Sequence, residues 1–258
     1  MNNVTGVSEL SFSELSFSQQ KLIELNAEDG FSSLVDGFNR ACETFPKRPA
    51  FTCLGQTLCF DEIEQLSRQF GCYLLEHCDL VAGDRVAVQL PNISQFPIAV
   101  WGILRAGLVV VNTNPMYTAR EQLHQFNDSG AKALVVLSDL LPVTEQVIPQ
   151  TAVETVIATS AIDLLQPQAL PATRLTNLVG FTDALALGAN KPLPERASSM
   201  SEVAVLQYTG GTTGPSKGAI LTHGNIFGGV RMSKLSVDFS DEAVPDLLIA
   251  PMPLYHVF

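Results

Sequence analysis

The chain has 258 residues, of which 46% are apolar and only 16% are charged. This length suits one large domain or two small ones, and it allows a core that needs no disulfide or metal to stabilise it. The composition excludes a disordered chain and a solvated coiled coil. The net charge of −11 argues against nucleic-acid binding, because phosphate affinity needs clustered cations, but a small phosphate ligand needs only one local positive pocket.

The first 30 residues predict a weakly ordered lead-in, with a short amphipathic helix as the alternative. They are rich in Ser and Glu, and no basic segment precedes an apolar one, so they do not fit a secretory signal. The five cysteines, an odd number without a Cys-x-x-Cys pair, fit neither a disulfide framework nor a zinc site. We expect free buried thiols and a reducing compartment, the cytoplasm.

Two helices and a hairpin are predicted next. Apolar residues recur at helical spacing over residues 31–45, which predicts an amphipathic helix that Pro46 ends. Residues 50–60 predict two short strands joined by a turn. Asp61 and Glu64 resemble a capping box, which predicts the start of a second helix. Its expected buried face consists of Ile63, Leu66, Phe70, Tyr73 and Leu74.

Predicted strands and helices then alternate along the chain. Strands are expected at 85–90, 108–111, 133–137 and 153–158, and helices at 94–105, at 140–148 and from a Thr118-x-x-Glu121 capping box to Gly130. The most apolar stretch, 96–111, is too short for a membrane span, so a buried helix and a buried strand are favoured over a span. The alternation predicts an α/β fold of mainly parallel sheets with helices on both faces.

Composition shifts divide the chain further. Residues 31–189 are predicted to form a first α/β subdomain. Residues 190–201, which carry two prolines and two neighbouring serines, predict a linker. Residues 202–258 are then the start of a second subdomain, opened by a strand at 203–209.

A loop rich in Gly and Thr lies between the predicted strands 203–209 and 219–222, at the tip of a hairpin. Its sequence over residues 208–218 is YTGGTTGPSKG. The glycines allow positive φ and close approach to a ligand, and consecutive amides in such a turn bind anions. The hydroxyls add donors, and Lys217 adds a cation. The spacing is neither a Walker A motif nor a dinucleotide fingerprint. Composition alone leaves two interpretations open: a loop that binds a polyphosphate, and a flexible hairpin turn that binds nothing.

The order of residues in this loop, YTGGTTGPSKGAILTH over 208–223, resembles the phosphate-loop signature of the adenylate-forming superfamily. This superfamily includes acyl- and aryl-CoA ligases, luciferases and the adenylation domains of peptide synthetases. Residues 105–121, RAGLVVVNTNPMYTARE, resemble its second motif, and residues 250–258, APMPLYHVF, resemble the start of its fourth. The likeness extends over residues 31–258, and within the superfamily it looks most like bacterial long-chain fatty-acyl-CoA ligases.

The resemblance implies an acid–thiol ligase. A fatty acid would attack the α-phosphate of ATP to give an acyl-adenylate and pyrophosphate, and coenzyme A would then displace AMP, with Mg²⁺ bridging phosphate oxygens. His256 would line the acyl pocket without transferring a proton, although a histidine packed under a Pro-rich turn is the alternative. The implied catalytic residues are Lys217 and His256, and the implied phosphate-binding residues are Thr209, Gly210, Gly211, Thr212, Thr213, Gly214 and Lys217.

Several segments of the family have no counterpart in these 258 residues: the Tyr-Gly-x-Thr-Glu segment that helps hold Mg²⁺, the ribose-binding Asp, the hinge and the small C-terminal domain. We therefore expect a truncated N-terminal domain that is inactive by itself and has no metal ligands of its own. The alternatives are a ligase for short-chain or aryl acids, adenylation without coenzyme A, and a non-catalytic relic that acts as a binding module. The expected partners are small molecules, and further expectations are peripheral contact with the inner face of the membrane and a homodimer of the full-length enzyme.

Overall fold

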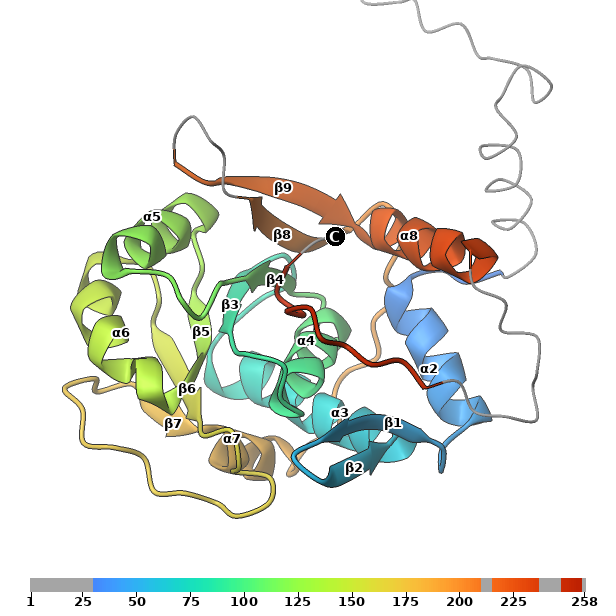
Figure 1. Cartoon of the computed structure of the whole chain (residues 1–258), viewed down its shortest axis with the longest axis horizontal. Helices are drawn as coiled ribbons and strands as arrows, with labels where there is room; N and C mark the ends of the chain where they lie inside the picture. The colour runs from blue at the N-terminus through green and yellow to red at the C-terminus, as the bar shows by residue number, and fades with distance from the viewer. Residues whose placement is uncertain (1–29, 210–214, 237–246, 257–258) are drawn as a thin grey trace, which may run out of the picture.

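The computed structural model describes residues 30–209, 215–236 and 247–256, and its centre is a seven-stranded sheet (Figure 1). The strand order is β7-β6-β5-β3-β4-β8-β9, in which only the last pair is antiparallel. The mainly parallel sheet predicted from the sequence is therefore confirmed. The strands are β3 (Arg85–Gln89), β4 (Val109–Asn112), β5 (Ala133–Leu137), β6 (Thr155–Thr159), β7 (Leu178–Gly180), β8 (Val203–Thr209) and β9 (Lys217–Thr222).

Helices cover both faces of this sheet because its strands are apolar on both sides. Val86 and Val88 face one layer, while Ala87 between them faces the other. The first layer consists of α2 (Leu34–Thr44), α3 (Phe60–His77), α4 (Gln95–Arg105) and α7 (Phe181–Gly188). The second consists of α5 (Ala119–Ser129) and α6 (Leu141–Val147), with single 3₁₀ turns at Ser138–Leu140 and Ile148–Gln150. A separate antiparallel pair, β1 (Pro49–Cys53) and β2 (Gln56–Cys59), lies beside α3, and α8 (His223–Ser236) follows β9 and contacts α2.

Most predicted elements are confirmed to within about two residues. Strand β5 has the predicted bounds, and so does β8. The capping box of α5 is present, because Thr118 N–H donates to the Glu121 carboxylate at 2.8 Å, and Gly130 ends the helix with a φ of 60°. The predicted buried face of α3 is confirmed, although Leu66 is only half-buried.

The predicted start of α3 is wrong by two residues. The helix begins at Phe60, and its cap is Cys59, whose N–H donates to Glu62 Oε2 at 2.7 Å. The side chains on which the prediction rested have other partners: Asp61 pairs with Lys47, and Glu64 pairs with Arg68. The prediction failed because Lys47 and Arg68, which lie outside the four-residue motif, form ion pairs with these two carboxylates.

Strand β7 and helix α7 have no counterpart among the predicted elements. The strand is only three residues long and exists through its pairing with β6. Residues 190–201 contain no helix or strand, as expected for a linker, but Leu193 is buried and Arg196 pairs with Glu202 at 2.8 Å. Because β4 pairs with β8, the sheet continues across this segment, and the division into subdomains stays a prediction.

The most apolar stretch, 96–111, forms most of α4 and then β4, as predicted. Within the described ranges no helix is long and apolar enough to cross a membrane. All five cysteines are free, as expected from their number and spacing, but the expected burial holds only for Cys42, Cys72 and Cys78, because Cys53 and Cys59 are half-buried. Burial raises the pKa of the Cys42 thiol to about 11, so this sulfur stays protonated inside the first helical layer.

Candidate functional site

The β8–β9 hairpin places two of the predicted site residues opposite each other. Thr209 and Lys217 form its last residue pair before the loop, and both are exposed. The hairpin predicted from the sequence is thus confirmed. The predicted phosphate-binding residues Gly210, Gly211, Thr212, Thr213 and Gly214 lie outside the described residues.

One glycine of the motif has a packing reason in this hairpin. A Cβ on Gly218 would lie 3.0 Å from the ring of Tyr208, its residue partner on β8. The tyrosine is 7% exposed and packs into the second helical layer. Gly218 therefore lets β9 lie directly against a buried aromatic ring, next to Lys217.

Helix α5 contacts β8 and the residue that directly precedes β9. Tyr208 OH donates to Asp128 Oδ2 at 2.6 Å, and His124 Nε2 lies 2.8 Å from the carbonyl oxygen of Ser216. Burial raises the pKa of Tyr208, and the Asp128 carboxylate raises it further, so the phenol keeps its proton and donates it. Burial also raises the pKa of Tyr117, against the opposing effect of a hydrogen bond with the Ser216 side chain.

Amide side chains fill the edge of the sheet where β3, β4 and β8 end. Asn112 Nδ2 donates to Gln207 Oε1 at 2.8 Å, Gln125 Nε2 donates to the Asn112 carbonyl at 2.8 Å, and Gln89 Nε2 donates to the Asn114 carbonyl at 3.2 Å. These bonds fix the chain between β4 and α5. In open parallel sheets, ligands bind at this carboxyl edge of the strands.

The segment 247–256 is held at the same edge of the sheet. In Figure 1 it is the dark red trace that crosses in front of α4 toward β4 and β8. Asn92 Nδ2 donates to the carbonyls of Ala250 and Met252 at 3.0 and 2.8 Å, and its Oδ1 accepts from Leu254 N–H at 2.8 Å. Gln207 Nε2 donates to the Tyr255 carbonyl at 2.9 Å.

These contacts bring His256 to the edge where the hairpin loop begins. Its neighbour Tyr255 is bonded to Gln207, which is two residues before Thr209 on the same strand. His256 is exposed, and its N–H donates to the Pro253 carbonyl at 3.0 Å. The structure therefore gathers Thr209, Lys217 and His256 at one edge of the sheet, while their roles stay predictions.

The residues that organise this edge, namely Asn92, His124, Asp128 and Gln207, were not predicted from the sequence. Only Asn92 carried a local signal, because it is a polar residue that follows an apolar strand after two intervening residues, Leu90 and Pro91. The partners of the others are far away in sequence, at separations of 92 residues for His124 and 80 residues for Asp128.

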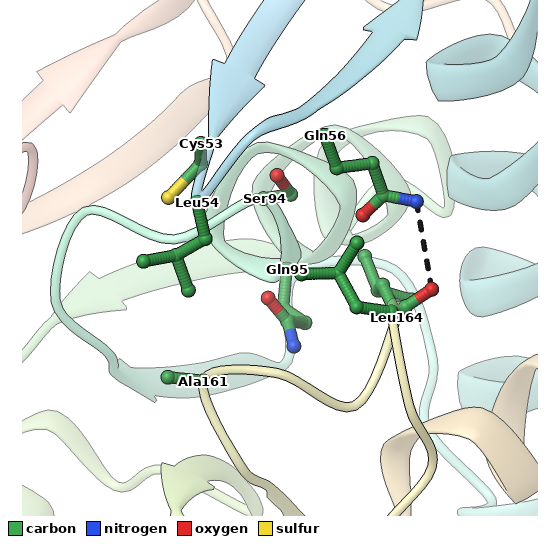
Figure 2. Close-up of a pocket in the computed structure, with 8 residues that line it drawn as sticks. Cys53, Leu54, Gln56, Ser94, Gln95, Ala161 and Leu164 are labelled. Atoms are coloured by element: carbon green, nitrogen blue, oxygen red, sulfur yellow. Dashed lines mark hydrogen bonds between the residues drawn. The ribbon is translucent and has the colours of Figure 1, made fainter.

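A small cavity lies elsewhere, between the β1–β2 hairpin, the start of α4 and the chain after β6 (Figure 2). It holds about 10 Å³, which is room for one water molecule and not for a metabolite. Gln56 closes one side by donating to the Leu164 carbonyl at 3.5 Å. This cavity is therefore a packing defect rather than a substrate site.

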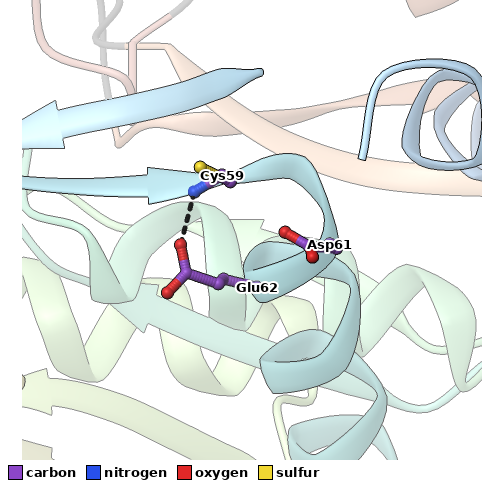
Figure 3. Close-up of side chains that lie close together, drawn as sticks. All are labelled: Cys59, Asp61 and Glu62. Atoms are coloured by element: carbon purple, nitrogen blue, oxygen red, sulfur yellow. Dashed lines mark hydrogen bonds between the residues drawn. The ribbon is translucent and has the colours of Figure 1, made fainter. Parts of the chain in front are cut away.

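Figure 3 shows a second cluster, in which side-chain atoms of Cys59, Asp61 and Glu62 lie within 4.8 Å of one another. Both carboxylates have structural roles at the start of α3, since Glu62 accepts from Cys59 N–H and Asp61 pairs with Lys47. Burial and the two carboxylates raise the pKa of the Cys59 thiol, which opposes the thiolate that a metal needs. The cluster is a helix cap.

The model of the AMP-binding enzyme family matches residues 38–258. The chain belongs to this family. The chain is 41% identical over 244 residues to a long-chain-fatty-acid–CoA ligase of Haemophilus influenzae, covering 88% of this chain and 43% of that protein. It is 38% identical over 246 residues to the ligase of the same name from Escherichia coli O157:H7, covering 89% and 44%. The chain thus spans less than half the length of these relatives.

Solved structures of related proteins have the same fold. A long-chain-fatty-acid-CoA ligase from Archaeoglobus fulgidus superposes with a TM-score of 0.66 at 25% identity, covering 87% of this chain and 43% of that one. A putative long-chain-fatty-acid CoA ligase from Rhodopseudomonas palustris gives a TM-score of 0.66 at 21% identity, covering 80% and 48%. The predicted α/β class and family resemblance are therefore confirmed.

Proposed function

We propose that this chain carries the phosphate-binding part of a long-chain fatty acid–CoA ligase. Such an enzyme activates a fatty acid as an acyl-adenylate at the expense of ATP and then forms the thioester with coenzyme A. The observation that carries the proposal is the 41% identity over 244 residues to a ligase of that name. The β8–β9 hairpin, which presents Lys217 beside a Gly/Thr loop at the carboxyl edge of a parallel sheet, supports it.

In this proposal the chain binds the triphosphate of ATP with one cation and many uncharged donors. Lys217 neutralises charge on the β- and γ-phosphates, and the loop residues 209–214 donate hydrogen bonds to phosphate oxygens. These groups stabilise the charge that builds on the departing pyrophosphate. His256 lies beside the fatty-acid carboxylate and shapes the entrance of the acyl pocket.

The residues around the hairpin fit a phosphate better than a metal ion. The two nearby carboxylates of α5 are engaged, since Glu121 caps its own helix and Asp128 accepts from Tyr208. Mg²⁺ prefers oxygen ligands, so it would enter this site together with the ATP that Thr209 and Lys217 would hold, and it would supply charge neutralisation for the leaving pyrophosphate.

Pyrophosphate release by the intact protein tests the reaction. The assay compares saturated acids of rising chain length at fixed ATP and Mg²⁺, with an aryl acid as the specificity control. We expect the highest kcat/KM with long-chain acids. No release with any fatty acid would refute the proposal, and a preference for short or aryl acids would reassign the substrate.

Lys217 provides a second, residue-level test. Lys217→Ala should raise the KM for ATP at least about tenfold, because the loss of one charge–phosphate contact amounts to about 1.4 kcal/mol or more. Lys191→Ala is a matched control, since Lys191 is also exposed but pairs with Glu76 on α3. An unchanged KM for ATP in the Lys217 variant would contradict the assigned role.

The proposal includes a place in the cell. We place the intact protein in the cytoplasm, in peripheral contact with the inner face of the membrane, because the low charge of the sequence favours apolar rather than electrostatic contact. Flotation with neutral liposomes tests this contact, and absence of the protein from the floating fraction would refute it.

A further inference from the structure

One face of α5 contacts the end of β8 and the residue that directly precedes β9. His124 and Asp128 are four residues apart and therefore lie on the same side of the helix. Asp128 accepts from Tyr208 OH at 2.6 Å, and His124 is bonded to the Ser216 carbonyl at 2.8 Å. A carbonyl oxygen only accepts, so His124 Nε2 carries the proton and donates it.

The two contacts flank the proposed phosphate loop on both sides. Tyr208 directly precedes Thr209, where β8 ends, and Ser216 directly precedes Lys217, where β9 begins. Thr209 and Lys217, the two described phosphate-binding candidates, are therefore each next to a residue that α5 holds. Fixing these two residues in place before the ligand arrives reduces the entropy cost of binding.

Helix α5 is itself firmly attached to the sheet. Phe126 is fully buried, and Gln125 donates to the Asn112 carbonyl at the end of β4. The Thr118–Glu121 capping box fixes the first turn of the helix. The helix is therefore attached to β4 and to the core by contacts other than those that it makes with the hairpin.

We propose that His124 and Asp128 are positioning residues for ATP. They hold the ends of β8 and β9 so that the loop and Lys217 are presented to the triphosphate, and they do so without touching the nucleotide. This inference rests on the proposed function of the loop, and it assigns to α5 a role in nucleotide affinity rather than in recognition of the acid.

The test compares His124→Ala with His124→Gln in the intact protein, with ATP and a long-chain acid varied separately. His124→Ala should raise the KM for ATP about tenfold and leave the KM for the acid within about twofold, because only the loop is released. The glutamine amide reaches about as far as Nε2 and should restore the KM for ATP to within about threefold. Asn127→Ala, an exposed change on the same helix, is the matched control and should leave both KM values unchanged.

Several results would overturn the proposal. They are an unchanged KM for ATP in His124→Ala, an equal rise in both KM values, and a glutamine variant no better than alanine. If His124→Ala does not fold, Tyr208→Phe decides, because it removes only the hydroxyl that Asp128 binds and keeps the ring against Gly218. Its KM for ATP should rise about threefold, and no change would refute the role of α5.

Binding of inorganic tripolyphosphate separates this inference from the proposed function. If the parent protein releases no pyrophosphate with any acid, the ligase assignment fails. Weaker binding of tripolyphosphate to His124→Ala than to the parent would still support loop positioning. Equal binding to the two proteins, or no binding to the parent, would refute it.

Discussion

Asn92 ties the segment that carries His256 to the end of β3, and removing its side chain is expected to release that segment. The amide makes three hydrogen bonds of 2.8 to 3.0 Å, two to the carbonyls of Ala250 and Met252 and one from Leu254 N–H. Asn92→Ala removes all three and leaves Gln207, which bonds the Tyr255 carbonyl, as the described side-chain tether of the segment.

The size of the effect follows from the number and exposure of these bonds. Asn92 is half-buried, so each bond contributes less than a fully buried one, about 0.7 kcal/mol net. The three together amount to about 2 kcal/mol in the free energy of local opening, which is about a 30-fold increase in the open population. The global free energy of unfolding should change much less, because the segment contributes few buried side chains.

Backbone amide hydrogen exchange measures this opening residue by residue. In Asn92→Ala the His256 amide, whose own bond to Pro253 is not altered, should exchange about 30-fold faster. Asn92→Asp keeps the acceptor for Leu254 N–H and loses the two donated bonds, so Leu254 should stay better protected than in the alanine variant. Asn190→Ala, which removes an amide bonded to the Leu187 carbonyl at the end of α7, should not change exchange in 250–256. Unchanged exchange of His256 in Asn92→Ala would refute the reasoning.

Three further substitutions test helix packing and one buried charge elsewhere in the fold. A Cβ on Gly188 would lie 1.9 Å from a backbone carbonyl oxygen of α3, so Gly188→Ala should lower the free energy of unfolding by about 3 kcal/mol. A Cβ on Gly228 would have no heavy atom within 4 Å, so Gly228→Ala should raise the free energy of unfolding by about 0.5 kcal/mol. Urea unfolding measures both, and a Gly188 variant as stable as the parent would contradict the helix contact. Burial acts to raise the pKa of Asp84, but hydrogen bonds from Val81 N–H and Lys132 outweigh it and hold the pKa below its usual value. The stabilisation by this carboxylate is therefore present above the unfolded-state pKa of about 3.9 and is lost as the pH falls through the folded-state value. Asp84→Asn should reduce the loss of stability between about pH 5 and about pH 2. An unchanged pH dependence of stability in this variant would count against the role of Asp84.

The sequence predicted correctly those elements whose boundaries are marked by residues a few positions apart. The bounds of β5 and β8 followed from apolar runs between turn residues, and the capping box of α5 lies within four residues of sequence. By contrast, α7 owes its position to α3, where Phe181 stacks on Phe70 at 5.0 Å between ring centroids. Stabilisation of that kind comes from a residue 111 positions away and has no local pattern to reveal it.

The order of residues along the chain predicted the α/β class, the resemblance to the family and the hairpin that carries Lys217, because the signals for each are motifs and periodicities of neighbouring residues. Only the tertiary structure decided what surrounds that hairpin. The parallel sheet brings the ends of β3, β4 and β8 to one edge, and there Asn92 meets a segment about 160 residues later while His124 meets Ser216. Directional hydrogen bonds of about 3 Å depend on where the folded backbone places their atoms, and sequence spacing does not contain that information.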